Sequence, residues 1–264
     1  MPRPPSRPAA SRLRDGLVRE RRGTEVLRGE GAPLRLGPWQ GDPQVAHVAP
    51  VSSGSPCSAG DVRRALDALR RQGYSSVLTA ALAPLDQAAF LTVGFTVHER
   101  LHLLARGLPA APPPGPPPGT SLRRAHHQDR RGVLAVDHAA FEPFWRLDDQ
   151  GLTDALAATP SSRFRVATNG DRRPGDVLGY AVVGRASSRG YVQRLAVAPG
   201  HHRAGLGRAL LLDGLRWLER RRVRRVMVNT QERNGAALAL YEREGFERQP
   251  GGLAVLTLGL GAVA

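Results

Sequence analysis

A run of seven prolines and two glycines within residues 109–119 divides the chain into two parts. Proline has no backbone N–H and a fixed φ, so this run can form neither a helix nor a central strand. Such a composition is typical of an extended, semi-rigid spacer between folded regions. We therefore expect a linker at 109–119, a first domain at 41–108 and a second domain at 120–264.

The segment before the first domain is rich in arginine and poor in large apolar side chains, which predicts a disordered basic arm over residues 1–40. The whole chain has 38 basic residues, all of them arginine, and a net charge of +15. The absence of lysine beside abundant Ala, Gly and Pro indicates the coding bias of a GC-rich bacterial genome. We therefore favour a compositional origin of the charge, and a nucleic-acid partner is the less favoured interpretation.

The chain of 264 residues is 41% hydrophobic, which is enough for a buried core. No apolar run approaches the ~20 residues that span a bilayer. The sequence begins without the apolar stretch of a secretory signal and has a single cysteine, Cys57. These features predict a cytoplasmic protein without an internal disulfide or a membrane partner, and we expect a monomer or a homodimer.

The second part of the chain alternates between the period of a strand and that of a helix. Strands are expected at 121–125, 164–168, 177–185, 190–197, 223–230 and 252–260, and helices at 130–141, 149–158, 205–221 and 234–245. This order predicts an α+β fold with a mixed, mostly antiparallel central sheet and helices on both faces.

The first part repeats a portion of this order, with a helix at 61–73, a strand at 74–80, a helix at 84–93 and a strand at 97–104. Ungapped alignment of the two parts pairs Val77 with Val228, Thr79 with Thr230, Phe90 with Tyr241, and Gly94–Phe95 with Gly245–Phe246. Chance similarity of two amphipathic segments is the alternative explanation. We expect a partial, inactive copy of the second part, because it lacks a Gly-x-Gly helix entry and has phenylalanine in place of Tyr241.

Two glycines, Gly205 and Gly207, stand where the strand at 190–197 turns into a helix. Glycine costs a helix about 1 kcal/mol relative to alanine, so two of them indicate that the backbone itself has a function there. A helix start offers unpaired N–H groups and the positive end of the helix dipole, and glycine lets a pyrophosphate approach the main chain. The sequence therefore predicts a phosphate site, with Arg203 and Arg208 at its flanks.

The stretch LAVAPGHHRAGLGRALL and the later NGAALALYEREGF together resemble the two cofactor motifs of the GNAT superfamily of acyl-CoA-dependent N-acyltransferases. The first motif is usually written Arg/Gln-x-x-Gly-x-Gly/Ala. Gly205 and Gly207 match it, whereas His202 stands at the Arg/Gln position. Asn234 and Tyr241 match the second motif. The resemblance implies a GNAT-like fold for the second part and a degenerate GNAT-like half for the first.

The same resemblance implies acetyl-CoA as co-substrate, without a metal. In the family the sheet splays between two central strands, and the pantetheine arm enters the gap. The cofactor-binding residues that the resemblance implies are Leu195, Ala196, Val197, His202, Arg203, Ala204, Gly205, Leu206, Gly207, Arg208 and Asn234.

The chemistry that the resemblance implies is direct attack of a neutral amine on the thioester, with Tyr241 protonating the leaving thiolate. Many relatives carry a catalytic glutamate at the position of Asn229, whose amide cannot accept a proton. The general base is therefore open, and the candidates are Glu232, His202, a water chain, His138 and Glu142.

These motifs predict an N-acetyltransferase that acts on the amine of a small molecule or on a protein amino group. The sequence indicates neither the acceptor nor the length of the acyl chain. Two alternatives remain from other functional classes. One is a non-catalytic acyl-CoA-binding regulatory protein, against which Tyr241 weighs, and the other is a basic nucleic-acid-associated protein.

Overall fold

A computed structural model describes residues 17–19, 24–51, 56–109, 115–170 and 176–261. The chain divides into two compact units, which are Met1–Leu101 with Gly251–Ala264 (unit 1) and His102–Pro250 (unit 2). This division corrects the domains expected at 41–108 and 120–264. The final strand, residues 253–259, belongs to unit 1, because it pairs there with strands of the first part of the chain.

The segment expected to be a disordered arm contains strands. β1 (Leu17–Arg19), β2 (Glu25–Leu27) and β3 (Leu34–Trp39) pair antiparallel in sequence order. The expectation of disorder over 1–40 is therefore wrong for these residues, while residues 1–16 and 20–23 lie outside the described chain. A few apolar side chains suffice here because they are deeply buried: Val26, Leu27, Leu34 and Leu36 are at most 5% exposed.

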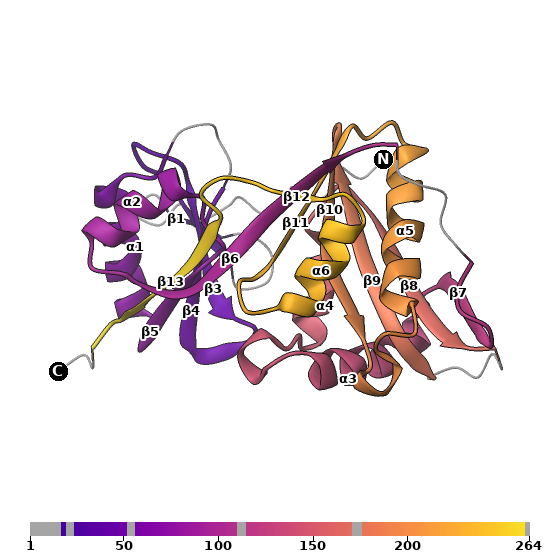
Figure 1. Ribbon diagram of the computed structural model, residues 1–264. Coiled ribbons are helices and arrows are strands. Elements are labelled where there is room, and N and C mark those ends of the chain that lie inside the picture. The colour runs from indigo at the N-terminus through magenta and orange to yellow at the C-terminus, as the bar shows by residue number, and fades with distance from the viewer. Residues whose placement is uncertain (1–16, 20–23, 52–55, 110–114, 171–175, 262–264) are drawn as a thin grey trace, which may run out of the picture. The chain divides into compact units, whose positions relative to one another are not determined.

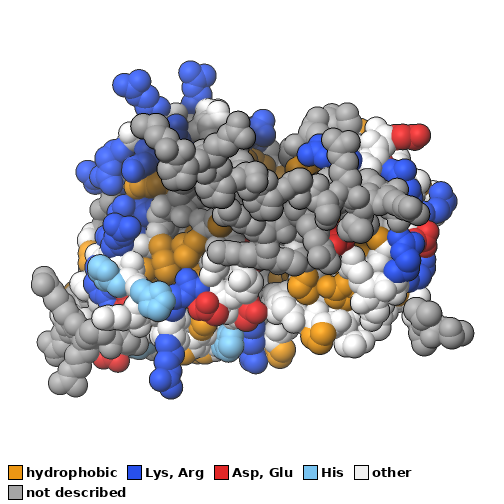
Figure 2. Space-filling view, turned by 180° about the vertical axis from the view of Figure 1, so that it is seen from behind, with side chains coloured by type: hydrophobic (Ala, Val, Ile, Leu, Met, Phe, Trp, Pro, Cys, Tyr) orange, Lys and Arg blue, Asp and Glu red, His pale blue; other side chains and the backbone are white. Residues whose placement is uncertain are grey.

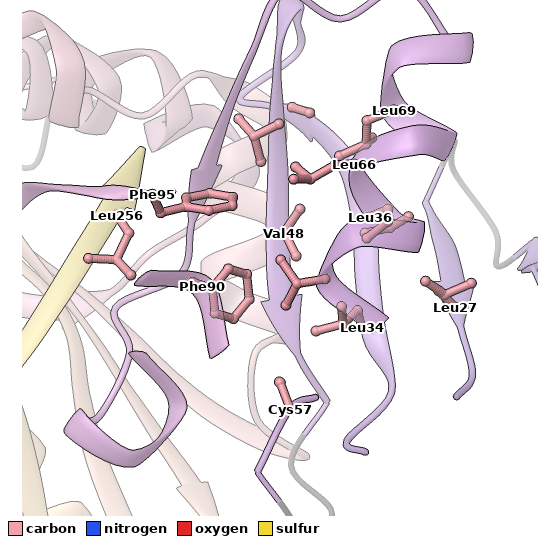
Figure 3. Packing of buried hydrophobic residues seen from close by; sticks show 14 of the residues in the cluster. Leu27, Leu34, Leu36, Val48, Cys57, Leu66, Leu69, Phe90, Phe95 and Leu256 are labelled. Carbon is pink, nitrogen blue, oxygen red and sulfur yellow. The ribbon is translucent and has the colours of Figure 1, made fainter. Parts of the chain in front are cut away.

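Unit 1 is a sheet with the strand order β1-β2-β3-β4-β5-β13-β6. Its further elements are β4 (Asp42–Pro50), α1 (Ala59–Arg71), β5 (Ser76–Thr79), α2 (Pro84–Thr92), β6 (Thr96–Gly107) and β13 (Leu253–Gly259). β4 and β5 pair in parallel, and β5 and β6 both pair antiparallel with β13. Side chains of α1, α2 and the strands form one core, which includes Leu34, Leu36, Val48, Leu66, Leu69, Phe90, Phe95 and Leu256 (Figure 3).

Unit 2 contains the second half of β6 and has the strand order β6-β11-β10-β9-β8-β7. Outside this order, β12 also pairs with β6. Its elements are β7 (Thr120–Arg124), α3 (Arg130–Ala140), α4 (Asp149–Ala157), β8 (Ser161–Asn169), β9 (Val177–Ala186), β10 (Arg189–Val197), α5 (Leu206–Glu219), β11 (Arg225–Gln231), α6 (Gly235–Arg243), β12 (Glu247–Arg248) and the short 3-10 turns η1 (His127–Asp129), η2 (Pro143–Trp145) and η3 (Pro199–His201). β7 to β10 are antiparallel, and β10 pairs in parallel with β11. The predicted α+β class with a mixed, mostly antiparallel sheet is confirmed.

The central strand β9 has helices on both faces, which explains its continuous apolar run (Figure 1). Tyr180 and Val182 lie in one core with residues of α3 and α4. Ala181 and Val183 face the other way, into cores that contain residues of α5. The alternation along β9 thus places α5 against one face of the sheet. The N-terminus of α5 follows the end of β10 in the chain.

Gly214 of α5 lies directly against β9. A Cβ atom added at Gly214 would lie 2.6 Å from Cγ2 of Val183, a stiff, 1% exposed β-branched side chain. We expect Gly214→Ala to lower the free energy of unfolding by about 1–3 kcal/mol despite the better helix propensity of alanine. Denaturant unfolding would measure this. Gly60→Ala, in α1, is the matched control, because the added Cβ lies 3.7 Å from its nearest neighbour. This change should leave the free energy of unfolding unchanged or raise it. Equal effects of the two changes would contradict the expected clash.

Candidate active site

The parallel strands β10 and β11 separate halfway along β10. Their paired residues run from Arg189 with Arg225 to Val192 with Val228, although β10 continues to Val197 and β11 to Gln231. The ladder between β10 and β9 shifts register at the same point, between Val192 and Arg194. This irregularity is a β-bulge, which bends its strand away from its neighbour. We call the unpaired edges of residues 193–197 and 229–231 the split.

Alternate residues of β10 turn their backbone groups toward the split. The N–H of Ala198 donates to the carbonyl of Leu178 at 2.8 Å, and the register pairs Ala196 with Tyr180. Even-numbered residues of this stretch therefore face β9, and the N–H and C=O groups of Leu195 and Val197 face the split. Ala196, which was predicted to bind the cofactor together with these two residues, directs its backbone N–H and C=O groups toward β9. An edge of this kind can pair with an extended chain that carries amide groups.

The start of α5 presents unpaired backbone donors. Gly205 is the N-cap residue with φ 87°, a conformation that favours glycine, and no side chain caps the helix. In the described part of the chain, no group accepts a hydrogen bond from the backbone N–H groups of Arg203–Arg208. A Cβ at Gly207 would make only ordinary van der Waals contacts, 3.6 Å from Leu240 and 3.7 Å from Val197. These donors and the helix dipole form a site suited to an anion.

The predicted side chains around this helix start differ in what they contact. Arg203 and Ala204 are exposed, whereas the Leu206 side chain is buried in the core and can serve only through its backbone. The guanidinium of Arg208 pairs with the buried carboxylate of Glu244. Arg208 is thus held by a structural partner, contrary to the expectation that it stands ready for phosphate oxygens.

His202, which occupies the Arg/Gln position of the motif, holds the loop to the end of β10. Its Nε2 atom lies 2.8 Å from the carbonyl oxygen of Val197. A carbonyl oxygen only accepts, so Nε2 carries the hydrogen and cannot serve as a general base. His138 is engaged in the same way, since its Nε2 lies 2.8 Å from the carbonyl oxygen of Leu147.

Tyr241 lies on α6 and is 5% exposed. Its ring packs against Phe246, with 5.7 Å between centroids, and its hydroxyl has no hydrogen-bond partner among the described residues. Burial raises the pKa of the phenol, and the positive charge of Arg194 partly offsets this rise. Tyr241 therefore stays protonated at neutral pH and can donate a proton.

The two predicted asparagines have different surroundings. The Oδ1 atom of Asn234 caps α6 by accepting from the N–H of Ala237 at 3.1 Å. Asn229 is exposed on the unpaired end of β11. Glu142 accepts from Arg233 at 2.6 Å, and Glu232 is exposed without a described partner.

A buried acid beside the split was not predicted from the sequence. Asp137 of α3 is fully buried and accepts from Arg194, from the hydroxyl of Tyr180 and from the N–H of Leu147. The available signal was an aspartate on the apolar face of a helix, one position after Val136 and four after Val133. A buried carboxylate needs such partners, and the spacing gives no sign of which residues supply them.

The corresponding helix start in unit 1 is filled by the protein's own side chains. Ser58 Oγ caps α1 by accepting from the N–H of Asp61 at 3.0 Å, and the buried Asp61 carboxylate accepts from the N–H of Gly31 at 2.8 Å. Phe90 replaces the phenol of Tyr241 and is fully buried. These differences support the prediction that the first copy is inactive.

In the described ranges, no group of three or more His, Cys, Asp or Glu side chains is placed to hold a metal ion. None of the helices in those ranges has the length and apolar character needed to cross a membrane.

Comparisons with known proteins agree with this geometry. The model of the Acetyltransferase (GNAT) family matches residues 131–246. A mycothiol acetyltransferase of Amycolatopsis mediterranei is 32% identical over 150 residues, which cover 52% of this chain and 49% of the relative. A mycothiol acetyltransferase of Pseudarthrobacter chlorophenolicus is 35% identical over 205 residues, covering 72% and 56%. The chain thus spans about half of the length of these two relatives.

Solved structures share the fold over both units. A tandem GNAT protein from the clavulanic acid biosynthesis pathway matches with a TM-score of 0.69 and 20% identity, covering 94% of this chain and 84% of that one. A GCN5-related N-acetyltransferase from Sphaerobacter thermophilus matches with a TM-score of 0.57 and 17% identity, covering 88% and 81%. The family model, the split and the two motifs agree: residues 131–246 match the Acetyltransferase (GNAT) family.

Proposed function

We propose that this protein is an acyl-CoA-dependent N-acetyltransferase whose unit 2 transfers the acetyl group of acetyl-CoA to an amine. The observation that carries the proposal is the combination of the split with the unpaired N–H groups of Arg203–Arg208. Tyr241, buried and protonated, adds the proton donor that the reaction needs. All three features lie within the matched residues 131–246.

Acetyl-CoA fits this arrangement part by part. The pyrophosphate would bind the amides of Arg203–Arg208, with the exposed guanidinium of Arg203 adding charge. The amide-bearing pantetheine arm would pair with the edge of β10 at Leu195 and Val197. An N–H at this edge can also stabilise the negative charge that develops on the thioester oxygen. His202 and Asn234 would shape the site through the loop and the helix cap that they hold.

The reaction proceeds by direct transfer. The lone pair of a neutral amine attacks the thioester carbon, a C–N bond forms, and the C–S bond breaks. Tyr241 gives its proton to the departing sulfur, and the attacking nitrogen loses one proton. Because Nε2 of His202 and of His138 carries a hydrogen, these rings could accept that proton only at Nδ1. Glu232 and a water chain are the other proposed acceptors. Asn229 would orient a water or the amine by hydrogen bonds.

The names of the relatives suggest which amine accepts the acetyl group. Since curated relatives are mycothiol acetyltransferases, mycothiol without its acetyl group is the first amine to test, and a protein amino group is the second. The relatives are bacterial, and we propose that this enzyme also works in a bacterial cytoplasm, as a monomer or homodimer.

The surface charge does not favour a nucleic-acid partner. Figure 2 shows arginine side chains scattered over the uncovered parts of one face, between acidic, histidine and hydrophobic side chains. Several arginines are also paired with carboxylates, as in Arg123–Asp129, Arg130–Asp149 and Arg163–Asp213. These pairs support the compositional interpretation of the net charge.

Calorimetric titration of the protein with acetyl-CoA tests the proposed function. We expect binding in the micromolar range, followed by release of free CoA thiol when the accepted amine is added. Folded protein that neither binds acetyl-CoA nor releases thiol with any amine would show that the GNAT fold has lost its activity here.

A further inference from the structure

The segment between α3 and α4 is bonded to both sides of the split. We call this segment, Phe141–Leu147, the connector. The side chain of Arg194, on β10, donates to the carbonyl of Trp145 at 2.6 Å. On the other side, Arg233, in the turn that follows β11, donates to the Glu142 carboxylate at 2.6 Å. The connector is therefore bonded to β10 where the split begins and to the turn that follows β11.

The two attachments differ in burial. Arg233 and Glu142 are 59% and 61% exposed, and an ion pair in water contributes little. The Arg194 side chain is only 14% exposed, and its partner Asp137 is 0% exposed. Its guanidinium also lies over the ring of Phe141, with 3.6 Å from Cζ to the ring centroid. Arg194 is therefore the firm attachment.

Asp137 joins Arg194 to the far end of the connector. Its carboxylate accepts from Nε of Arg194 at 2.8 Å and from the N–H of Leu147 at 2.7 Å. One side chain of β10 is thus tied to the first residue of the connector by stacking, to Trp145 directly, and to the last residue through Asp137. Arg194 also directly precedes Leu195, whose backbone faces the split.

We propose that Arg194 is a positioning residue for the acyl transfer, because it locks the connector across the split and so fixes the path by which the amine reaches the thioester. This inference rests on the proposed function. Arg194 acts through the connector and does not itself contact either substrate. Its charge also acts on Tyr241, where it lowers the phenol pKa that burial raises.

The test compares Arg194→Met with a matched control. Arg163 forms a similar two-pronged pair with Asp213 on the α5 side of the sheet, with contacts of 2.7 and 2.9 Å and side chains that are 22% and 19% exposed. Arg163→Met removes this ion pair without touching the connector, and Asp213 keeps its contact with Arg165 at 3.3 Å. If Arg194→Met does not fold, the double variant Arg194→Met/Asp137→Asn replaces it in the test, because it leaves no unpaired carboxylate buried. Arg194→Lys retains the charge and tests rescue.

Three measurements are made on the full chain: hydrogen exchange of peptides covering 141–147, calorimetric Kd for acetyl-CoA, and amine KM from thiol release with the amine that the wild type accepts. For Arg194→Met we expect the hydrogen-exchange rate of residues 141–147 and the amine KM to rise about tenfold or more, whereas the Kd for acetyl-CoA changes less than threefold. Arg194→Lys should give an exchange rate and a KM between those of the wild type and Arg194→Met. Unchanged exchange and KM, or equal changes in Arg163→Met, would overturn the inference. If the wild type does not bind acetyl-CoA, the proposed function fails instead, and hydrogen exchange alone decides whether Arg194 holds the connector.

Discussion

Replacing Gly207 with glutamate is expected to abolish acetyl-CoA binding while making the folded protein more stable. Gly207 is the second residue of α5, in the turn whose N–H groups have no partner in the described chain. A glutamate there gains helix propensity and interacts favourably with the helix dipole, each worth roughly 0.5–1 kcal/mol. Its carboxylate would occupy the position of the pyrophosphate and repel it. We expect a loss of affinity of at least ~100-fold, which corresponds to about 2.7 kcal/mol.

Gly207→Ala is the control for this change. The added methyl group would make only ordinary contacts, 3.6 Å from Leu240 and 3.7 Å from Val197, so the variant should fold and gain stability without a new charge. We expect it to retain most of the binding. Calorimetry gives Kd and thermal unfolding gives stability. Unaltered binding by a stabilised Gly207→Glu protein would show that the phosphates of acetyl-CoA bind elsewhere, and loss of both properties would indicate misfolding.

The motifs predict a site because glycine and tyrosine report on local backbone and chemistry. Gly205 has a left-handed conformation that favours glycine, and Tyr241 of the second motif is a buried phenol. The split itself could not be read from the sequence. It depends on a register shift next to Gln193, and this shift decides that Leu195 and Val197, but not Ala196, face away from β9.

Non-local pairing explains the errors at the domain boundaries. The strand at 253–259 follows unit 2 in the chain, yet its partners are β5 and β6, more than 150 residues earlier. Local composition also misjudged residues 25–39, because a few alternating leucines are enough when a distant helix covers them. The partners of Arg208 and His202 are likewise set by the fold, and residue type alone gave no sign of them.

The second large effect is expected for Tyr241→Phe, which should lower kcat by about 10²–10³-fold, the usual contribution of a positioned proton donor. The change removes one hydroxyl that has no described hydrogen-bond partner and keeps the ring that packs against Phe246. Stability and the Kd of acetyl-CoA should therefore remain near those of the wild type. Tyr74→Phe, a hydroxyl removal in unit 1, is the matched control and should leave kcat unchanged.

The pH dependence gives the same test a second readout. A phenol whose pKa is raised stays protonated to higher pH, so the wild type should lose no activity through ionisation of Tyr241 below about pH 10, the ordinary value for tyrosine. In Tyr241→Phe the thiolate leaves without this donor, and kcat should stay low across the whole range. A variant with wild-type kcat would mean that water protonates the sulfur. The predicted polar side chains Arg208, His202 and Asn234 are bound to structural partners, so their loss would alter folding as well as chemistry, whereas loss of the Tyr241 hydroxyl separates the two.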